Sequence, residues 1–301
     1  MQWTRWRCWG DSIKALKRAK ALLGTLVEIS VNGDNELLLL AATDAAFARI
    51  ENIHRAMSFH EQTSDLQAIA RCCAGECVVV DQDTSSVLQL ALHVEHDSEG
   101  IFNPTIAPTL VRRGLLPRPS CAGSIPNPST LASSIRVETA LVVRVLRPVW
   151  IDLGGIAKGY AVDAATQVLI DHGVNTGVVN AGGDLRVFGD TGQPIHLRHP
   201  SNPGEQIPIA ILQELSCATS GDYFVASSGA DAAQTAVIGV RATGAETQAS
   251  ITVIAPLCAV ADALTKVLWI AGIDSAISRA LLSNYEAQAV ALDTDGVSTY
   301  A

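Results

Sequence analysis

Residues 150–184, WIDLGGIAKGYAVDAATQVLIDHGVNTGVVNAGGD, constrain the fold more than any other part of the chain. The apolar run 141–151 predicts a strand that leads into a glycine-rich turn. Apolar side chains then recur at helical spacing over 160–169. A second apolar strand, 176–180, ends at another glycine pair. The sequence therefore predicts a unit of strand, glycine turn, helix, strand and glycine turn.

Two acidic residues, Asp152 and Asp184, lie beside these glycine turns. Glycine lets a backbone adopt left-handed dihedrals and approach a ligand closely, and we interpret Gly154, Gly155 and Gly159 in this way. Turns of this kind present backbone N–H groups that favour phosphate. The pattern matches neither the Walker A nor the GxGxxG nucleotide motif. The alternative is that these glycines only make tight turns. Packing alone does not require two glycine turns that each adjoin an aspartate, so we favour a ligand-binding role.

Composition and charge exclude some classes of protein. A net charge of −9 and a pI near 5.2 argue against a nucleic-acid binder, which needs a basic face. No apolar run approaches the roughly 18 residues of a membrane span. Seven cysteines, an odd number without paired spacing, predict reduced thiols. The basic N-terminal residues lack the apolar stretch of a signal peptide, and no such stretch precedes Cys8 as it would precede a lipidated cysteine. We therefore expect a cytoplasmic location.

Strands and helices alternate along the chain, which predicts an α/β or mixed α+β class. Residues 100–117 predict a stiff loop, because Pro104 and Pro108 within it cannot donate backbone hydrogen bonds. We expect residues 1–20 to be a poorly defined extension and residues 21–301 to form a single domain. The clearest further elements are predicted at 21–32, 36–59, 235–241, 249–254 and 259–271.

Seven motifs occur in one order along the chain: LLGTLVEI, MSFHEQTSDL, GIFNPTIAPTL, IDLGGIAKGYAVD, NAGGDL, ATSGDY and ADALTKVLWIAG. This ordered set resembles the FAD:protein FMN transferase (ApbE-like) family over residues 21–292. The resemblance implies a two-lobed fold with FAD, the substrate, in the cleft between the lobes. It implies transfer of FMN from FAD to a Thr or Ser hydroxyl of an acceptor flavoprotein, with release of AMP. It also implies Mg²⁺ as a cofactor.

The same resemblance implies roles for particular residues. Asp262 and Lys158 are expected to be catalytic. The carbonyl of Gly155 and the carboxylate of Asp262 match metal-ligand positions, with Thr265 and Lys266 at the position of a further ligand. A cation there would stabilise the charge that builds up as the diphosphate is cleaved. The residues expected to bind FAD are Leu23, His60, Ile101, Phe102, Asn103, Asp152, Lys158, Asp184, Thr219 and Ile238.

Three positions depart from the family pattern. Asn103 stands where the family usually has Asp, which removes one negative charge. Lys266 stands where the family offers a Thr or Ser hydroxyl, and Thr265 precedes that position by one residue. The family's segment with His and Asp is replaced by TAVIGVRATG at 235–244, which has neither.

These departures leave alternatives open. One is an FAD diphosphatase that uses water in place of the acceptor hydroxyl, and another is an FAD-binding protein without catalysis. Single residues also have simpler explanations. Asp262 could stabilise a helix dipole, Thr219 could cap a turn, and Lys158 and His60 could be solvated surface residues.

Overall fold

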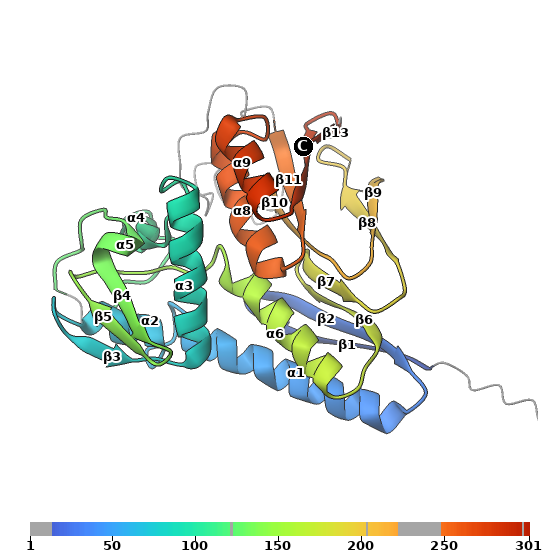
Figure 1. The fold of residues 1–301 in the computed structure, drawn as a ribbon, viewed down its shortest axis with the longest axis horizontal. Helices are drawn as coiled ribbons and strands as arrows, with labels where there is room; N and C mark the ends of the chain where they lie inside the picture. The colour runs from blue at the N-terminus through green and yellow to red at the C-terminus, as the bar shows by residue number, and fades with distance from the viewer. Residues whose placement is uncertain (1–13, 121–122, 203, 222–247, 297) are drawn as a thin grey trace, which may run out of the picture.

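The computed structural model describes residues 14–120, 123–202, 204–221, 248–296 and 298–301. The predicted strand at 235–241 and the predicted FAD contact Ile238 lie outside the described residues. The chain forms two lobes, a large one built on a long sheet and a small one built on a short sheet (Figure 1).

The large lobe is organised by an eight-stranded sheet in the order β1-β2-β6-β7-β10-β11-β12-β13. Every neighbouring pair is antiparallel, so the mixed α+β form of the predicted class is confirmed. The strands are β1 (Lys14–Leu22), β2 (Thr25–Gly33), β6 (Thr176–Ala181), β7 (Asp184–Phe188), β10 (Ser216–Gly221), β11 (Gln248–Ala255), β12 (Gln288–Asp293) and β13 (Ser298–Tyr300).

The first predicted strand, 21–32, is a hairpin of two strands in the structure. β1 pairs with β2 along its whole length, from Leu22 opposite Thr25 to Lys14 opposite Gly33. The sheet therefore begins at Lys14, and residues 14–20 belong to it rather than to an extension. Apolar and polar residues alternate only weakly in KALKRAKAL, so pairing with β2 determines that this segment is a strand.

Helices cover one face of the large sheet (Figure 1). They are α1 (Glu36–Met57), α6 (Ala157–Asp171), α8 (Cys258–Ala271) and α9 (Ala276–Asn284). A hairpin of β8 (Gln193–Arg198) and β9 (Gln206–Leu212) packs on the opposite face. Side chains of β10 alternate between the two layers, with Ala218 in the helix-side core and Cys217 in the hairpin-side core.

The small lobe contains a three-stranded sheet in the order β3-β5-β4. Its strands are β3 (Cys77–Val79), β4 (Ile135–Thr139) and β5 (Val142–Val145). Its helices are α2 (Asp65–Arg71), α3 (Gln82–Asp97), the 3₁₀ helix η1 (Pro104–Ile106), α4 (Ala107–Arg112) and α5 (Leu131–Ser134). No helix among the described residues is both long enough and apolar enough to cross a membrane.

Two predictions were wrong in the small lobe. The predicted strand 141–151 is shorter, because only Val142–Val145 finds strand partners and the rest continues as an irregular segment. The predicted stiff loop 100–117 contains η1 and α4. Pro104 and Pro108 lie in the first turns of these helices, where the missing N–H has no partner to lose.

The glycines of the 150–184 stretch act differently from the prediction. Left-handed dihedrals occur at Gly182 and Gly183, with φ of 67° and 105°, and these two residues form the tight turn between β6 and β7. Gly154, Gly155 and Gly159 do not adopt such dihedrals. The second glycine pair is therefore a hairpin turn. Space rather than backbone freedom explains Gly154 and Gly159, whereas a Cβ on Gly155 would make only ordinary contacts at 3.5 Å and beyond.

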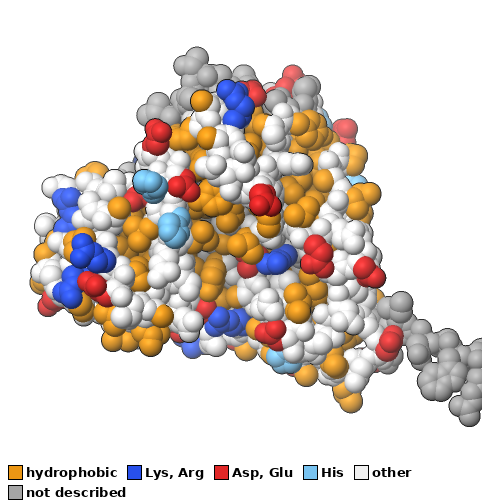
Figure 2. Space-filling view, viewed as in Figure 1, with side chains coloured by type: hydrophobic (Ala, Val, Ile, Leu, Met, Phe, Trp, Pro, Cys, Tyr) orange, Lys and Arg blue, Asp and Glu red, His pale blue; other side chains and the backbone are white. Residues whose placement is uncertain are grey.

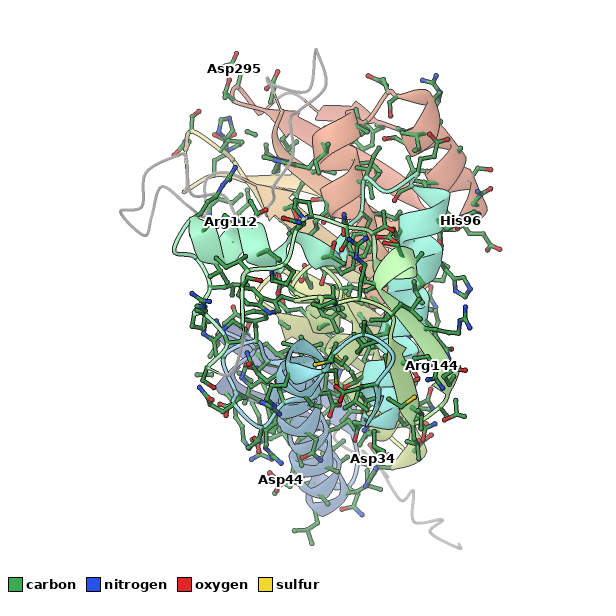
Figure 3. The ribbon with its side chains drawn as sticks, turned by 90° about the vertical axis from the view of Figure 1, so that its left-hand side faces the viewer. Asp34, Asp44, His96, Arg112, Arg144 and Asp295 are labelled. Atoms are coloured by element: carbon green, nitrogen blue, oxygen red, sulfur yellow. The ribbon has the colours of Figure 1, made fainter. Side chains whose placement is uncertain are left out.

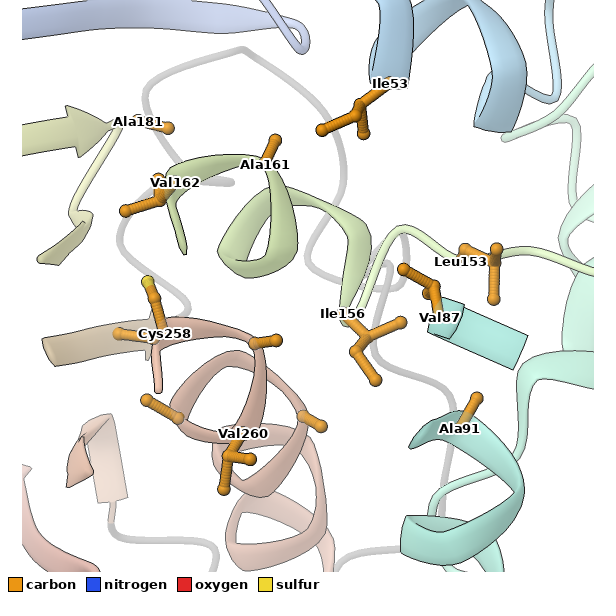
Figure 4. Close-up of a cluster of buried hydrophobic side chains, with 14 of the residues drawn as sticks. Ile53, Val87, Ala91, Leu153, Ile156, Ala161, Val162, Ala181, Cys258 and Val260 are labelled. Atoms are coloured by element: carbon orange, nitrogen blue, oxygen red, sulfur yellow. The ribbon is translucent and has the colours of Figure 1, made fainter. Parts of the chain in front are cut away.

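Gly159 is required by the close approach of α6 and α8. A Cβ at this position would lie 2.3 Å from the carbonyl oxygen of Cys258 and 2.7 Å from Cα of Ala259. Figure 4 shows Cys258 on the side of α8 that faces α6, whereas Ala161 points from the other side of α6 toward Ile53 of α1. The two helices can come this close only because Gly159 has no side chain.

We expect Gly159→Ala to lower the free energy of unfolding by about 2–4 kcal/mol, because helix α8 must move away from α6 to admit the methyl group. Urea denaturation would measure the change. Gly204→Ala is the matched control, since its Cβ would meet only Asn202 Oδ1 at 3.8 Å and should change stability by less than about 0.5 kcal/mol. Equal stability of the two variants would contradict the close-packing explanation.

Candidate functional site

A pocket of about 280 Å³ opens where the two lobes meet. Its apolar wall comes from the β1–β2 turn, the end of α1 and the small lobe, and its polar residues come from the segments at 58–60 and 152–158. The pocket brings together four of the predicted FAD-binding residues, which are Leu23, His60, Asp152 and Lys158. The other lining residues are Gly24, Ile53, His54, Met57, Ser58, Phe59, Leu116, Leu153, Gly154 and Ala157.

Local backbone features place the pocket residues. Leu23 and Gly24 form the two-residue turn between β1 and β2, and both have positive φ, 55° and 72°. Such a φ is unfavourable for leucine, so the turn holds an apolar side chain at the pocket at a local cost. The segment after α1 bends at Ser58, whose Oγ accepts hydrogen bonds from the N–H of His60 at 3.2 Å and of Glu61 at 3.3 Å.

Asp152 is held at the pocket by hydrogen bonds on both sides. Its N–H donates to the carbonyl of Pro104 at 2.8 Å, and its Oδ1 accepts from the N–H of Gly154 at 3.1 Å. Burial raises the pKa of Asp152, while the Gly154 N–H and the nearby His60 act in the opposite direction. Gly154 leaves room for this arrangement, because a Cβ there would lie 3.3 Å from both carboxylate oxygens.

Beside the pocket lies a cluster of four charged side chains from three elements. Lys158 of α6 bonds to Asp184 of β7 and also lies 3.7 Å from Oδ2 of Asp262 on α8. Lys266, one turn further along α8, bonds to Oδ1 of the same Asp262. Both carboxylates are buried, whereas side chains such as Asp34, Asp44 and Asp295 lie at the periphery (Figure 3).

The pKa values of the cluster follow from burial and from the partners. Burial alone would lower the pKa of Lys158, but the carboxylates of Asp184 and Asp262 raise it well above its usual value. Burial would raise the pKa of Asp262, yet Lys158 and Lys266 together lower it. Burial raises the pKa of Asp184, and its one adjacent lysine offsets only part of this effect. Lys158 is therefore a permanent cation at the wall of the pocket.

The residues at the predicted metal site do not fit Mg²⁺. The charges of two ammonium and two carboxylate groups cancel, so the cluster has no net negative charge with which to bind a divalent ion. Unit charges 4 Å apart interact by about 4 kcal/mol at an effective dielectric constant near 20, so the two ammonium groups repel a divalent ion about as strongly as the two carboxylates attract it. Among the described residues, no group of three or more His, Cys, Asp or Glu side chains is placed to hold a metal ion.

The predicted ligand hydroxyl of Thr265 is also engaged. Its Oγ1 donates to the carbonyl of Asp262 at 2.7 Å and lies 2.9 Å from Oγ of Ser220. Thr219, predicted to bind FAD, pairs with Thr252 on the neighbouring strand at 2.8 Å between the two hydroxyl oxygens. Both threonines thus have partners within the sheet and helix that carry them.

The 101–103 segment lies outside the lining of this pocket. Asn103 caps η1, because its Oδ1 accepts from the N–H of Thr105 at 2.8 Å and its amide donates to Ser129 at 2.9 Å. Phe102 is buried, and its ring edge would lie 3.5 Å from a Cβ on Gly155. Ile101 is partly buried against the main core. None of these three residues lines the pocket, and Phe102 packs beside Gly155 in the segment that carries Asp152 and Lys158.

Comparison with known proteins identifies the family. The sequence profile of the ApbE family matches residues 23–291. The chain belongs to the ApbE family.

Individual relatives agree with this assignment. A protein of Haemophilus influenzae named FAD:protein FMN transferase is 28% identical over 261 residues, 79% of this chain and 74% of the relative. A protein of Rhodobacter capsulatus with the same name is 28% identical over 215 residues, 67% of this chain and 41% of that relative. The crystal structure of the ApbE protein from Thermotoga maritima superposes with a TM-score of 0.77 at 25% identity, covering 96% of this chain and 97% of that one.

Sequence reasoning missed one structural part of this ApbE site. Asp163 of α6 caps the start of α8, where its carboxylate accepts from the N–H of Cys258 at 3.0 Å and of Ala259 at 2.9 Å. Arg186 holds the same carboxylate at 2.9 Å. Asp163 ends the motif IDLGGIAKGYAVD, so its presence was visible, but its partners lie about ninety-five residues away. A capping contact over such a distance has no local signal.

We expect Lys158→Met to lower the free energy of unfolding by about 3 kcal/mol at neutral pH, because Asp184 would stay buried without its cation. The loss should shrink as the pH falls. A carboxyl whose folded pKa is raised above its unfolded value near 3.9 destabilises the fold only while it is ionised. Denaturant unfolding at several pH values would measure this.

Lys17→Met is the control for this prediction. Lys17 forms an ion pair with Glu28 at 2.7 Å in which 65% of the lysine side chain is exposed. Pairs of this kind contribute about 0–1 kcal/mol. A Lys158→Met variant that loses no more stability than Lys17→Met, or whose loss grows as the pH falls, would contradict the buried-carboxylate explanation.

Proposed function

We propose that this ApbE family protein transfers FMN from FAD to a Thr or Ser hydroxyl of an acceptor flavoprotein and releases AMP. One observation carries the proposal. Leu23, His60 and the pair Asp152 and Lys158 come from three separate segments and meet at one pocket. The names of the relatives support FAD as the substrate and a protein as the acceptor.

In this proposal the pocket takes the flavin end of FAD. Its volume of about 280 Å³ lies near the lower end of the roughly 300–1,000 Å³ of ligand pockets, so it suits one ring system rather than a whole dinucleotide. Leu23, Ile53 and Met57 would pack against the apolar part of the ring, and the polar groups of His60 and Asp152 would fix its orientation.

Lys158 is the cation nearest to where the diphosphate would lie. It lines the pocket, and 31% of its side chain is exposed. Its ammonium group would bind a phosphate oxygen and stabilise the negative charge that builds up there during transfer. In the reaction the acceptor hydroxyl oxygen attacks the phosphorus of the FMN moiety and its proton is released to water. The bond to the AMP oxygen breaks, and AMP leaves with that electron pair.

Magnesium dependence is implied by the sequence resemblance alone and is not part of this proposal, because the charge cluster is already neutral without a metal ion. The cytoplasmic location likewise stays a prediction from the N-terminal sequence. Neither is needed for the pocket to bind FAD or for Lys158 to face a phosphate.

The experiment that tests the function is incubation of the purified protein with FAD and a flavin-accepting protein fragment. We expect AMP release together with a mass gain of one FMN on the fragment, measured by chromatography and by intact-protein mass spectrometry. Replacing the acceptor Thr or Ser of the fragment by Ala or Val should abolish the mass gain. AMP release that does not depend on the acceptor would identify an FAD diphosphatase, and bound FAD without AMP release would identify a binding protein.

We expect Leu23→Asn to weaken FAD binding about tenfold, because the pocket loses an apolar contact equivalent to about 1.4 kcal/mol. Asparagine tolerates the positive φ of this position better than leucine does, so stability should stay within about 1 kcal/mol. Fluorescence titration with FAD and thermal unfolding would measure the two effects.

Leu26→Asn is the matched control in the same hairpin. Leu26 is 55% exposed and does not line the pocket, so its substitution should leave FAD affinity unchanged. An equal loss of affinity in the two variants would show that the hairpin as a whole, and not the Leu23 side chain, decides binding.

A further inference from the structure

Lys266 occupies the position at which a metal ion would meet Asp262. Its ammonium group bonds to Oδ1 of Asp262 and lies 3.1 Å from Oγ1 of Thr265. Its methylene chain packs beside Gly155, where an added Cβ would lie 3.6 Å from Cγ and Cε of the lysine. One side chain thus contacts all three of the other residues that the sequence places at the metal site.

The second carboxylate oxygen of Asp262 is also engaged. Oδ2 of Asp262 accepts from the N–H of Gly159 at 3.2 Å and faces the ammonium of Lys158 at 3.7 Å. The Asp262 side chain has no exposed surface, and 18% of the Lys266 side chain is exposed. A cation that is covalently part of α8 therefore holds the carboxylate from one side while α6 holds it from the other.

We propose that Lys266 replaces the divalent cation in this chain, so that the protein binds FAD without a metal ion at Asp262. The spacing makes this replacement simple. Residues four apart on a helix lie on the same face, so a lysine one turn after Asp262 delivers its ammonium group to that carboxylate without any change of backbone.

The part of the inference that concerns FAD rests on the proposed function. Lys158 lines the pocket, and Lys266 lies on the other oxygen of the same carboxylate. The diphosphate of FAD would therefore meet Lys158 at the pocket, while Lys266 takes the place of a metal ion in neutralising Asp262. Ammonium groups bind phosphate through charge-assisted hydrogen bonds and need no dissociable ion.

The test compares the wild-type protein with Lys266→Thr and Lys266→Val. Both variants remove the ammonium group and leave the cluster one charge more negative, but only threonine supplies an oxygen ligand. Mn²⁺ is the metal probe, because it prefers the same oxygen ligands as Mg²⁺ and its free ion has a measurable paramagnetic resonance signal. Circular dichroism would check that the variants are folded.

We expect the wild-type protein to leave the signal of free Mn²⁺ unchanged. Lys266→Thr should bind Mn²⁺ at least about tenfold more tightly than Lys266→Val does. Mn²⁺ binding to the wild-type protein as tight as to Lys266→Thr would overturn the proposal. Failure of Lys266→Thr to bind would overturn it as well, because Lys266 would then not be what excludes the ion. The wild-type measurement needs no variant, so it shows whether the wild-type protein binds Mn²⁺ even if a variant does not fold.

A second measurement separates this inference from the proposed function. FAD binding to the wild-type protein is measured in excess EDTA and in excess Mg²⁺, and the two affinities should agree within about twofold. A clear rise in FAD affinity with Mg²⁺ would overturn the replacement of the metal by Lys266. Absence of FAD binding in both conditions would overturn the proposed function alone, because the Mn²⁺ measurement contains no FAD.

Discussion

The burial of two carboxylates, Asp184 and Asp262, is the constraint on which the rest of the site depends. A buried carboxylate is tolerated only with a partner of opposite charge, and here Lys158 and Lys266 supply the partners. Because the four residues come from α6, β7 and α8, the charge balance fixes how two helices lie on the sheet. Gly159 makes the balance attainable, since the helices must be close for its N–H to reach Asp262. Figure 2 shows charges of both signs spread over the surface, where no such constraint applies.

Much of the site could be predicted from the sequence, because its residues are carried by ordered motifs. Leu23, His60, Asp152 and Lys158 were expected together and line one pocket. Asn103 and Thr219 were expected to bind FAD, but Asn103 caps η1 and Thr219 pairs with a neighbouring strand. Asparagine and threonine side chains can form hydrogen bonds with a ligand or with neighbouring groups of the protein. Sequence alone does not decide between these uses, since the choice depends on which partner the fold brings closer.

Elements that depend on a local sequence pattern were predicted best. Elements that depend on pairing with a distant strand were predicted worst. Helices α1 and α8 were placed to within two residues, because apolar side chains recur at helical spacing along both of them. The run at 141–151 is as apolar as a strand, yet most of it has no neighbour to pair with. The glycines of one motif also turned out to differ in role. Gly154 makes room for a carboxylate, while Gly159 makes room for a helix. Composition cannot separate these roles, since both require only the absence of a Cβ.

The two lysines of the cluster are not equivalent, and this difference bears on how an anion could be accepted. A neutral cluster offers a diphosphate no free positive charge, so one lysine must exchange a carboxylate for a phosphate. Lys158 is the more exposed of the two and lines the pocket, and the carboxylate it would leave is Asp184, whose pKa burial raises. Lys266 is more buried and holds Asp262, whose pKa is lowered and which must stay ionised. The arrangement therefore gives Lys158 the contact with the anion and Lys266 the task of keeping Asp262 neutralised while that contact is made.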